Sequence, residues 1–220
     1  MPALRHLSQV ALEHMYPTNL VPIFCNPPPS NSPQILHASS ALLLAIQCDI
    51  PSVLPAVVYY VLSSYDRGPV GSSHHLPLDF QKGYSTLQSV ATYLCTTLTI
   101  PDAMLPPSML ADGPRPFHAL LRSEFLCHPL YGYRSCFDIV QGRWLATLAR
   151  HTVNRTISPS NGSDANIPLL HALRELEERI GTNIEVSGAH PCESCYWAER
   201  RLMRRLVGAI LAALPWWFGL

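Results

Sequence analysis

Four cysteines of the chain have the residue type and spacing of metal ligands. Cys192 and Cys195 form a Cys-x-x-Cys pair near the C-terminus, and Cys127 and Cys136 form a wider pair upstream. Thiolates at the first spacing can share one tetrahedral zinc ion, and a structural zinc site takes four protein ligands. The cysteines therefore predict one zinc site that ties the last helix to a helix beginning near Cys136.

Two other interpretations of these cysteines stay open. A Cys-x-x-Cys pair is also the motif of thiol–disulfide oxidoreductases, but that motif needs a βαβ context, and no strand is predicted in this chain. Cysteine is also among the residue types most often buried, so all four could be apolar packing residues. His128 and His190 lie close to the cysteines as spare ligands, whereas Cys25, Cys48 and Cys95 are interpreted as core or incidental.

Residues that could perform catalysis are scattered. The sequence holds no Gly-rich phosphate loop and no nucleophile elbow, and His74 and His75 lie in a loop without an acidic partner placed by sequence. One helical segment carries charges interpreted as a solvated face with i,i+4 pairs, namely Arg174, Glu175, Glu177, Glu178 and Arg179. We therefore predict that the chain is not an enzyme.

The composition bears on which partners the chain could bind and on its cellular location. The 220 residues are 48% hydrophobic and 14% charged, with a formal net charge of zero, so nothing steers the whole chain toward nucleic acid. The Arg-rich run 199–205 alternates with apolar residues, as the polar side of a packed helix does. Seven cysteines and an N-terminus without an apolar signal core favour an intracellular location, in cytoplasm or nucleus.

The segment from Ile35 to Ser64 is the one stretch long and apolar enough to suggest a membrane span. Its single charge, Asp49, lies at the middle and is followed by Pro51, and a charge at the bilayer centre is costly. We interpret Asp49 as the N-cap of a second helix, which splits the segment into two buried helices. The alternative is a membrane-associated helical protein that inserts residues 35–64.

The periodicity of apolar residues predicts an all-α fold, an irregular bundle of about seven helices joined by Pro-rich loops. Leu4, Leu7, Val10 or Ala11, and Met15 mark the apolar face of a first helix. Further helices are predicted on either side of Asp49 and over 84–100, 135–152, 168–180 and 193–214. The predicted domains are a helical region 1–156, a flexible linker 157–167 and a C-terminal helical pair 168–220.

The aromatic end of the chain has its own prediction. Trp216, Trp217 and Phe218 follow Pro215, which is predicted to end the last helix. Three consecutive exposed aromatic residues would form an apolar surface patch that favours aggregation. At least two of them are therefore expected to fold back onto the bundle.

Both ends of the chain carry motifs of one known family. The segments "ALRHLSQVALEHMYPTNL" and "HASSALLLAIQCDIPSVLPAVVYYVLSSY" resemble the helical region that follows the BTB fold in fungal BTB/POZ-domain proteins. The C-terminal end is also similar to theirs, with a Cys-x-x-Cys pair, an Arg-bearing helix and a Leu-Pro-x-x-Phe-Gly-Leu end. Such proteins often carry a loosely spaced cysteine pair at the place of Cys127 and Cys136. The resemblance thus adds weight to the zinc prediction.

The chain departs from that family in two ways. No strand-rich BTB fold precedes Ala3, and Ala213 stands where the family pattern has Trp. Dimerisation and cullin recruitment, which depend on the BTB fold, therefore do not carry over. The resemblance implies a non-catalytic protein-interaction or scaffold segment with an unidentified protein partner, the alternative being a truncated gene product without independent function.

Overall fold

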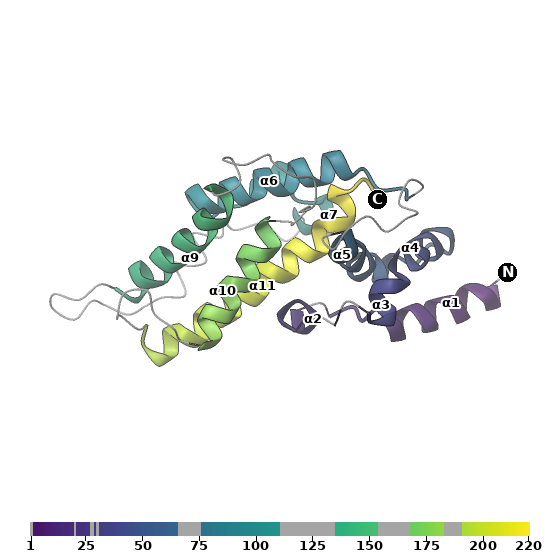
Figure 1. Cartoon of the computed structure of the whole chain (residues 1–220), viewed down its shortest axis with the longest axis horizontal. Coiled ribbons are helices and arrows are strands. Elements are labelled where there is room, and N and C mark those ends of the chain that lie inside the picture. The colour runs from purple at the N-terminus through teal and green to yellow at the C-terminus, as the bar shows by residue number, and fades with distance from the viewer. Residues whose placement is uncertain are drawn as a thin grey trace. The chain divides into compact units, whose positions relative to one another are not determined.

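A computed structural model gives the fold, and it describes residues 2–19, 21–26, 29, 31–65, 76–110, 135–153, 168–182 and 191–220 (Figure 1). The described residues form helices and no strand, which confirms the predicted all-α class. Seven helices in this part of the chain have ten or more residues: α1 (Pro2–Met15), α4 (Ala38–Gln47), α5 (Leu54–Tyr65), α6 (Phe80–Thr97), α9 (Cys136–Val153), α10 (Pro168–Thr182) and α11 (Glu193–Trp217).

The helices belong to two compact units. Unit 1 holds the described residues of Met1–Gly83 and of Gly208–Leu220, and unit 2 holds those of Tyr84–Ser160 and of Ile167–Val207. Helices α6 and α11 contribute residues to both. The linker predicted at 157–167 lies outside the described residues.

Unit 1 contains residues 35–64, the segment for which the sequence analysis gave membrane insertion as an alternative. Helix α5 packs against α4 and against the short α3 (Pro33–Leu36), and α1 packs against α4. Val57, Val58 and Leu62 of α5 are fully buried in this core. The apolar stretch is thus split into two helices, as predicted. No helix among the described residues has the length and apolar character that crossing a bilayer requires.

Asp49 does not have the role that the sequence predicted. It adopts a left-handed conformation, with a φ of 51°, immediately after α4, and its N–H donates to the Ile46 carbonyl at 3.1 Å. The next N–H, of Ile50, reaches back to Ala45 at 2.9 Å, which completes a Schellman motif. Asp49 therefore ends α4 instead of capping the following helix, and its carboxylate accepts a hydrogen bond from Arg5.

Helix α1 turns a different face to the core from the one predicted. Leu7 and Val10 are 64% and 53% exposed, whereas Leu12 and Tyr16 are buried. The Tyr16 hydroxyl donates to the Gln34 carbonyl at 2.9 Å, and its ring packs edge-on against Tyr60. Helical periodicity identified the helix correctly, but the stripe through Leu7 and Val10 lies on its outer side.

Two of the Pro-rich segments contain short helices. The Pro-rich segment 21–33 includes α2 (Val21–Cys25), whose Phe24 is fully buried, and Ser32 caps α3 by accepting the Ile35 N–H. Helix α6 starts earlier than predicted because the Asp79 carboxylate caps it, accepting the Lys82 N–H at 2.9 Å. Farther along, η3 (Asp102–Met104) and α7 (Pro107–Leu110) form short turns, like η1 (Pro51–Val53) in unit 1.

The aromatic end of the chain folds back, as predicted. Trp217 and Phe218 are fully buried, and the Phe218 carbonyl accepts the Asp79 N–H at 2.9 Å. Helix α11 runs three residues beyond the predicted end, to Trp217, with Pro215 inside its last turn, where the ring nitrogen donates no hydrogen bond to the carbonyl one turn earlier. Gly219, with a φ of 86°, then closes the helix in a second Schellman motif, in which the Leu220 N–H donates to the Pro215 carbonyl.

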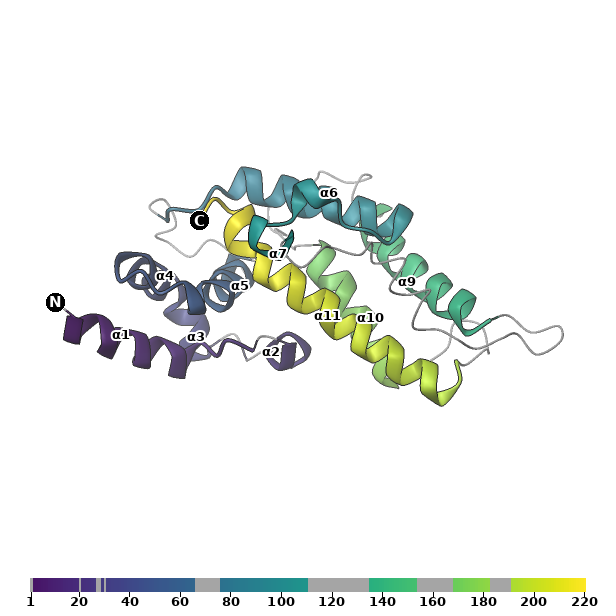
Figure 2. The same ribbon diagram turned by 180° about the vertical axis from the view of Figure 1, so that it is seen from behind.

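Unit 2 contains α9, α10 and the first part of α11. Helices α9 and α10 pack along their length (Figure 1), and α10 is tied to α11 by an ion pair between Glu177 and Arg200. Figure 2 shows the same helices from behind. Apolar side chains of all three are fully buried, among them Trp144, Leu173 and Leu202. This packing holds the starts of α9 and α11 in place.

Candidate metal centre

Cys136 is placed by the cap of α9. The Ser135 hydroxyl accepts the Asp138 N–H at 3.1 Å and donates to the Asp138 carboxylate at 2.6 Å, and that carboxylate also accepts the Ser135 N–H. This is a capping box with Asp in the third helical position. Because the box defines where α9 begins, Cys136 is its first helical residue, with its side chain half-buried.

Cys192 and Cys195 lie at the start of α11. The Cys192 carbonyl accepts the Tyr196 N–H at 2.9 Å, so Cys192 is the N-cap residue and Cys195 the third residue of the helix. The two thiols differ in environment. Cys192 is exposed to solvent, whereas Cys195 is only 2% exposed.

The sulfurs of Cys136, Cys192 and Cys195 converge. All three Sγ atoms lie within 4.8 Å of one another, and the Cys192 N–H donates to the Cys136 sulfur at 3.3 Å. Sulfurs on one tetrahedral zinc are about 3.8 Å apart, as follows from Zn–S bonds of about 2.3 Å. The three thiols could therefore bind a metal ion after small side-chain rotations.

The electrostatic environment of the three-cysteine cluster favours negative charge. Helices α9 and α11 both begin at the cluster, so the positive dipole ends of two helices meet there. Two positive dipole ends side by side repel each other unless an anion lies between them. Metal-bound thiolates supply that negative charge, so the arrangement suits a thiolate-ligated cation better than three neutral thiols.

A buried ion pair lies along the same two helices. Glu199, one turn after Cys195, is fully buried and accepts hydrogen bonds from the Arg143 guanidinium and, at 2.8 Å, from the Trp144 indole N–H. Burial raises the pKa of Glu199 above its ordinary value, and Arg143 and Trp144 oppose that rise without cancelling it. The ion pair of Arg143 with Glu199 therefore holds α9 against α11 one helical turn beyond Cys195.

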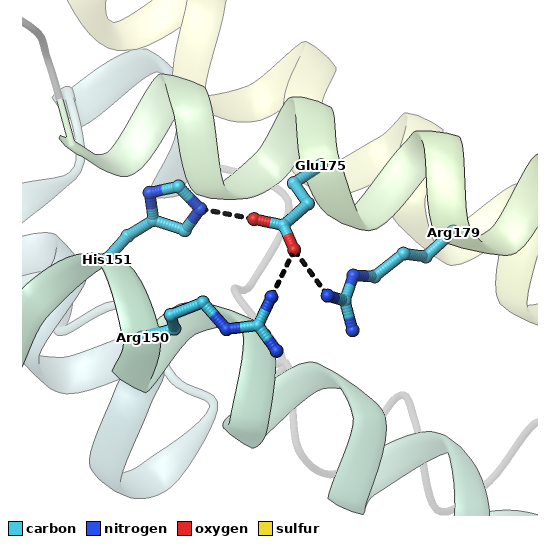
Figure 3. Close-up of polar contacts among 4 residues, drawn as sticks. All are labelled: Arg150, His151, Glu175 and Arg179. Carbon is cyan, nitrogen blue, oxygen red and sulfur yellow. Dashed lines mark hydrogen bonds and ion pairs between the residues drawn. The ribbon is translucent and has the colours of Figure 1, made fainter. Parts of the chain in front are cut away.

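A second polar cluster joins α9 to α10 (Figure 3). The Glu175 carboxylate contacts His151 at 2.5 Å, Arg150 at 2.8 Å and Arg179 at 2.6 Å. Partial burial acts to raise the pKa of Glu175, but the hydrogen bond to His151 and the charges of Arg179 and Arg150 outweigh it and lower the pKa. With both of its oxygens engaged, by His151, Arg150 and Arg179, this carboxylate is suited to holding the helices together.

The outcome for the predicted ligands differs from residue to residue. The structure brings together Cys136, Cys192 and Cys195, whereas Cys127 lies outside the described residues, as do His128 and His190. A four-cysteine site therefore stays a prediction. Cys48 and Cys95 are half-buried and do not belong to the cluster.

Sequence reasoning missed the polar contacts that support the site. Glu175 was assigned to a solvated face, but it bridges two helices, and Glu177 is only 9% exposed. Glu199 lies in the run Glu-Arg-Arg, whose spacing gives no indication that its first member is buried. The i,i+4 pair of Glu175 with Arg179 was the one part of this network readable from spacing, and the structure contains it.

No protein-family model matches the chain, and neither a curated protein nor a solved structure matches it. The likeness to BTB/POZ-domain proteins therefore stays a prediction from sequence motifs. The candidate metal centre rests on the geometry of this chain's own residues.

Proposed function

We propose that the chain is a non-catalytic protein-interaction or scaffold segment whose helices α9 and α11 are joined by one structural zinc ion. The observation that supports this proposal is the convergence of Cys136, Cys192 and Cys195 from two helices. The partners of Cys136 in this cluster are 56 or more residues away in sequence. A metal at this point would act as a cross-link between distant parts of the chain.

The ligand set favours zinc among the common metals. Thiolates are soft ligands that select zinc, copper(I) or iron–sulfur clusters over magnesium or calcium. Zinc takes four ligands in structural sites, and Cys127 is the proposed fourth. A site closed by four protein ligands leaves no open position for a substrate, which is why the proposal is structural and not catalytic.

The interaction role is supported by apolar side chains on the outer face of α1. Leu7 and Val10, which are three residues apart and share one face of α1, are 64% and 53% exposed, and Met15 at the end of the helix is 38% exposed. An apolar stripe on a helix that already packs through its other side is typical of a surface that a protein partner covers. This part of the proposal agrees with the family resemblance of the N-terminal segment.

Metal content and unfolding of the purified chain test the zinc site. We expect one bound zinc per chain, and a chelator should lower the unfolding temperature because metal binding is coupled to folding. The Cys192→Ser variant should lose both properties. The Cys48→Ser variant, altered at a half-buried thiol outside the cluster, should keep them. A wild-type chain that binds no zinc and unfolds identically with and without chelator would contradict the proposal.

The interaction role needs a separate test. The double variant Leu7→Glu/Val10→Glu should keep the wild-type unfolding temperature, since both side chains are exposed, but should lose its co-purifying protein partner from the native cell. Gln88→Glu/Thr92→Glu, which adds the same charge to exposed positions of α6, is the control. Equal partner recovery by the two double variants would argue against this role for α1.

A further inference from the structure

We propose that Cys192 is a site of oxidation by hydrogen peroxide, which joins its sulfur to that of Cys136 in a disulfide and expels the bound metal. The disulfide requires only the geometry of the two cysteines. The metal-release step rests on the proposed zinc site. The inference thus adds a mode of regulation to a site otherwise described as structural.

The three thiols of the cluster are not equally accessible. Cys192 is exposed and Cys136 is half-buried, whereas Cys195 is 2% exposed. A small oxidant in water therefore reaches Cys192 first, because susceptibility to oxidation follows exposure and thiolate character. The same comparison leaves Cys195 as the least reactive member.

The geometry selects Cys136 as the second sulfur. The Cys136 Sγ accepts the Cys192 N–H at 3.3 Å, so it already lies against the residue that is oxidised. The two sulfurs are within 4.8 Å, and a disulfide requires about 2.05 Å. Each cysteine is at a helix start, where rotation of the side chain can close that gap.

The charge at the site changes as the disulfide forms. In the proposed zinc-bound state the ligating cysteines are thiolates, and they lie at the starts of α9 and α11. Formation of the disulfide removes the negative charge of two thiolates from between the two helix ends, and the released zinc carries its positive charge away. The oxidised state therefore differs from the zinc-bound state in electrostatics as well as in covalent structure.

The reaction balances without another reagent. The Cys192 thiolate attacks one oxygen of hydrogen peroxide, the O–O bond breaks, and the departing hydroxide takes up a proton to become water. The resulting sulfenic acid is attacked by the Cys136 thiolate, which forms the S–S bond and displaces a second hydroxide, also protonated to water. Two thiols lose two electrons in total, hydrogen peroxide gains them, and zinc leaves as the divalent ion.

The disulfide would also change how the chain is held together. It would link residues that are 56 positions apart, the first residue of α9 and the N-cap of α11. A cross-link closing a loop of that size restricts the unfolded chain considerably. The oxidised protein would therefore keep α9 and α11 connected after the metal is lost, and Cys195 would remain a thiol.

Peptide mapping of the full chain after peroxide treatment tests the inference. The zinc-loaded and metal-free chains are each treated with hydrogen peroxide, alkylated and digested, and released zinc is measured with a chromogenic chelator. We expect a Cys136–Cys192 disulfide in both samples, and in the zinc-loaded sample one zinc released per disulfide formed. Cys48→Ser should behave like the wild type, and Cys136→Ser should form no disulfide and stop at Cys192 sulfenic acid or its further oxidation products.

The outcomes separate this inference from the proposed function. If the chain binds no zinc but forms the Cys136–Cys192 disulfide, the zinc proposal fails and the oxidation site stands. If the chain binds zinc but peroxide yields a Cys192–Cys195 disulfide or no disulfide, the oxidation site is refuted and the zinc proposal stands. Because these outcomes are read from the covalent product of the wild-type chain, they do not depend on how well a variant folds.

Discussion

The ring of Phe218 lies directly against the Cα of Gly83. A β-carbon built at position 83 would come within 2.4 Å of the Phe218 Cδ1 and Cε1 atoms. Phe218 is fully buried and also packs edge-on against Phe80 in the first turn of α6. The C-terminal end of the chain is therefore seated on the start of α6 through a contact that only glycine permits.

Gly83→Ala should destabilise the protein even though alanine favours helix. The added methyl group must displace a buried ring, and overpacking of this kind costs about 1–3 kcal/mol. Gly142, in the middle of α9, is the matched control, because a β-carbon there meets nothing within 4 Å. Gly142→Ala should stabilise by about 0.5–1 kcal/mol. Urea unfolding of both variants measures the difference, and a stabilised Gly83→Ala variant would contradict the contact.

The sequence predicted where the long helices lie better than which side of each is buried. Leu173, Leu176 and Ile180 of α10 are fully buried, in agreement with their periodicity. Leu7 and Val10 of α1 have similar periodicity and are exposed. Spacing identifies an apolar stripe, but whether another element covers that stripe depends on tertiary packing.

Helix ends were harder to predict for a local reason. Asp is common as an N-cap and is also tolerated in the left-handed conformation that ends a helix, so the order Cys-Asp-Ile-Pro fits either role. The structure shows the second role for Asp49. At the metal centre, cysteine spacing pointed to three residues that do meet, whereas the burial of Glu199 depends on Arg143, which is 56 residues away.

Arg143→Met should be strongly destabilising at neutral pH. The change leaves the fully buried Glu199 without its cation, and breaking a buried ion pair on one side costs about 3–5 kcal/mol. Arg204→Met, at an exposed position of the same helix as Glu199, should change stability by less than about 0.5 kcal/mol. The free energy of unfolding in urea at pH 7 measures both.

The pH dependence of Arg143→Met gives an independent check of the same ion pair. Burial already raises the pKa of Glu199 in the folded state, and loss of the Arg143 charge removes the main effect opposing that rise. A carboxyl whose folded-state pKa lies above its unfolded value binds protons more tightly when folded. The variant should therefore recover stability as pH falls from 7 toward 5. A deficit that does not change over this range would contradict the prediction.

Glu175 should contribute to stability with the opposite dependence on pH. Its folded-state pKa is lowered from the usual value of 4.5, so its contribution is present above pH 4.5 and is lost as pH falls through the lower folded-state pKa. Glu175→Gln should be less stable than wild type at neutral pH by about 1 kcal/mol, and the difference should shrink below pH 4.5.

Unfolding measured from pH 7 to pH 3 tests this prediction. The exposed neighbour Glu178→Gln is the control, since it removes one carboxylate from α10 without touching the contacts of Figure 3. The two variants should differ most at neutral pH and converge in acid. Parallel curves for the two would show that the contacts to Arg150, His151 and Arg179 add nothing to stability.

Substitutions of Gly219 should rank by their tolerance of a left-handed backbone. Gly219 has a φ of 86° and a β-carbon there would meet only Asp79 Cβ at an ordinary 3.6 Å, so backbone conformation and not space is the cost. Gly219→Ala should cost about 1 kcal/mol, Gly219→Asn less, and Gly219→Val more, because β-branching worsens the clash with the backbone. Thermal unfolding of the three variants gives the order directly. Equal destabilisation by all three would mean that the Schellman motif at Gly219 does not stabilise the end of α11.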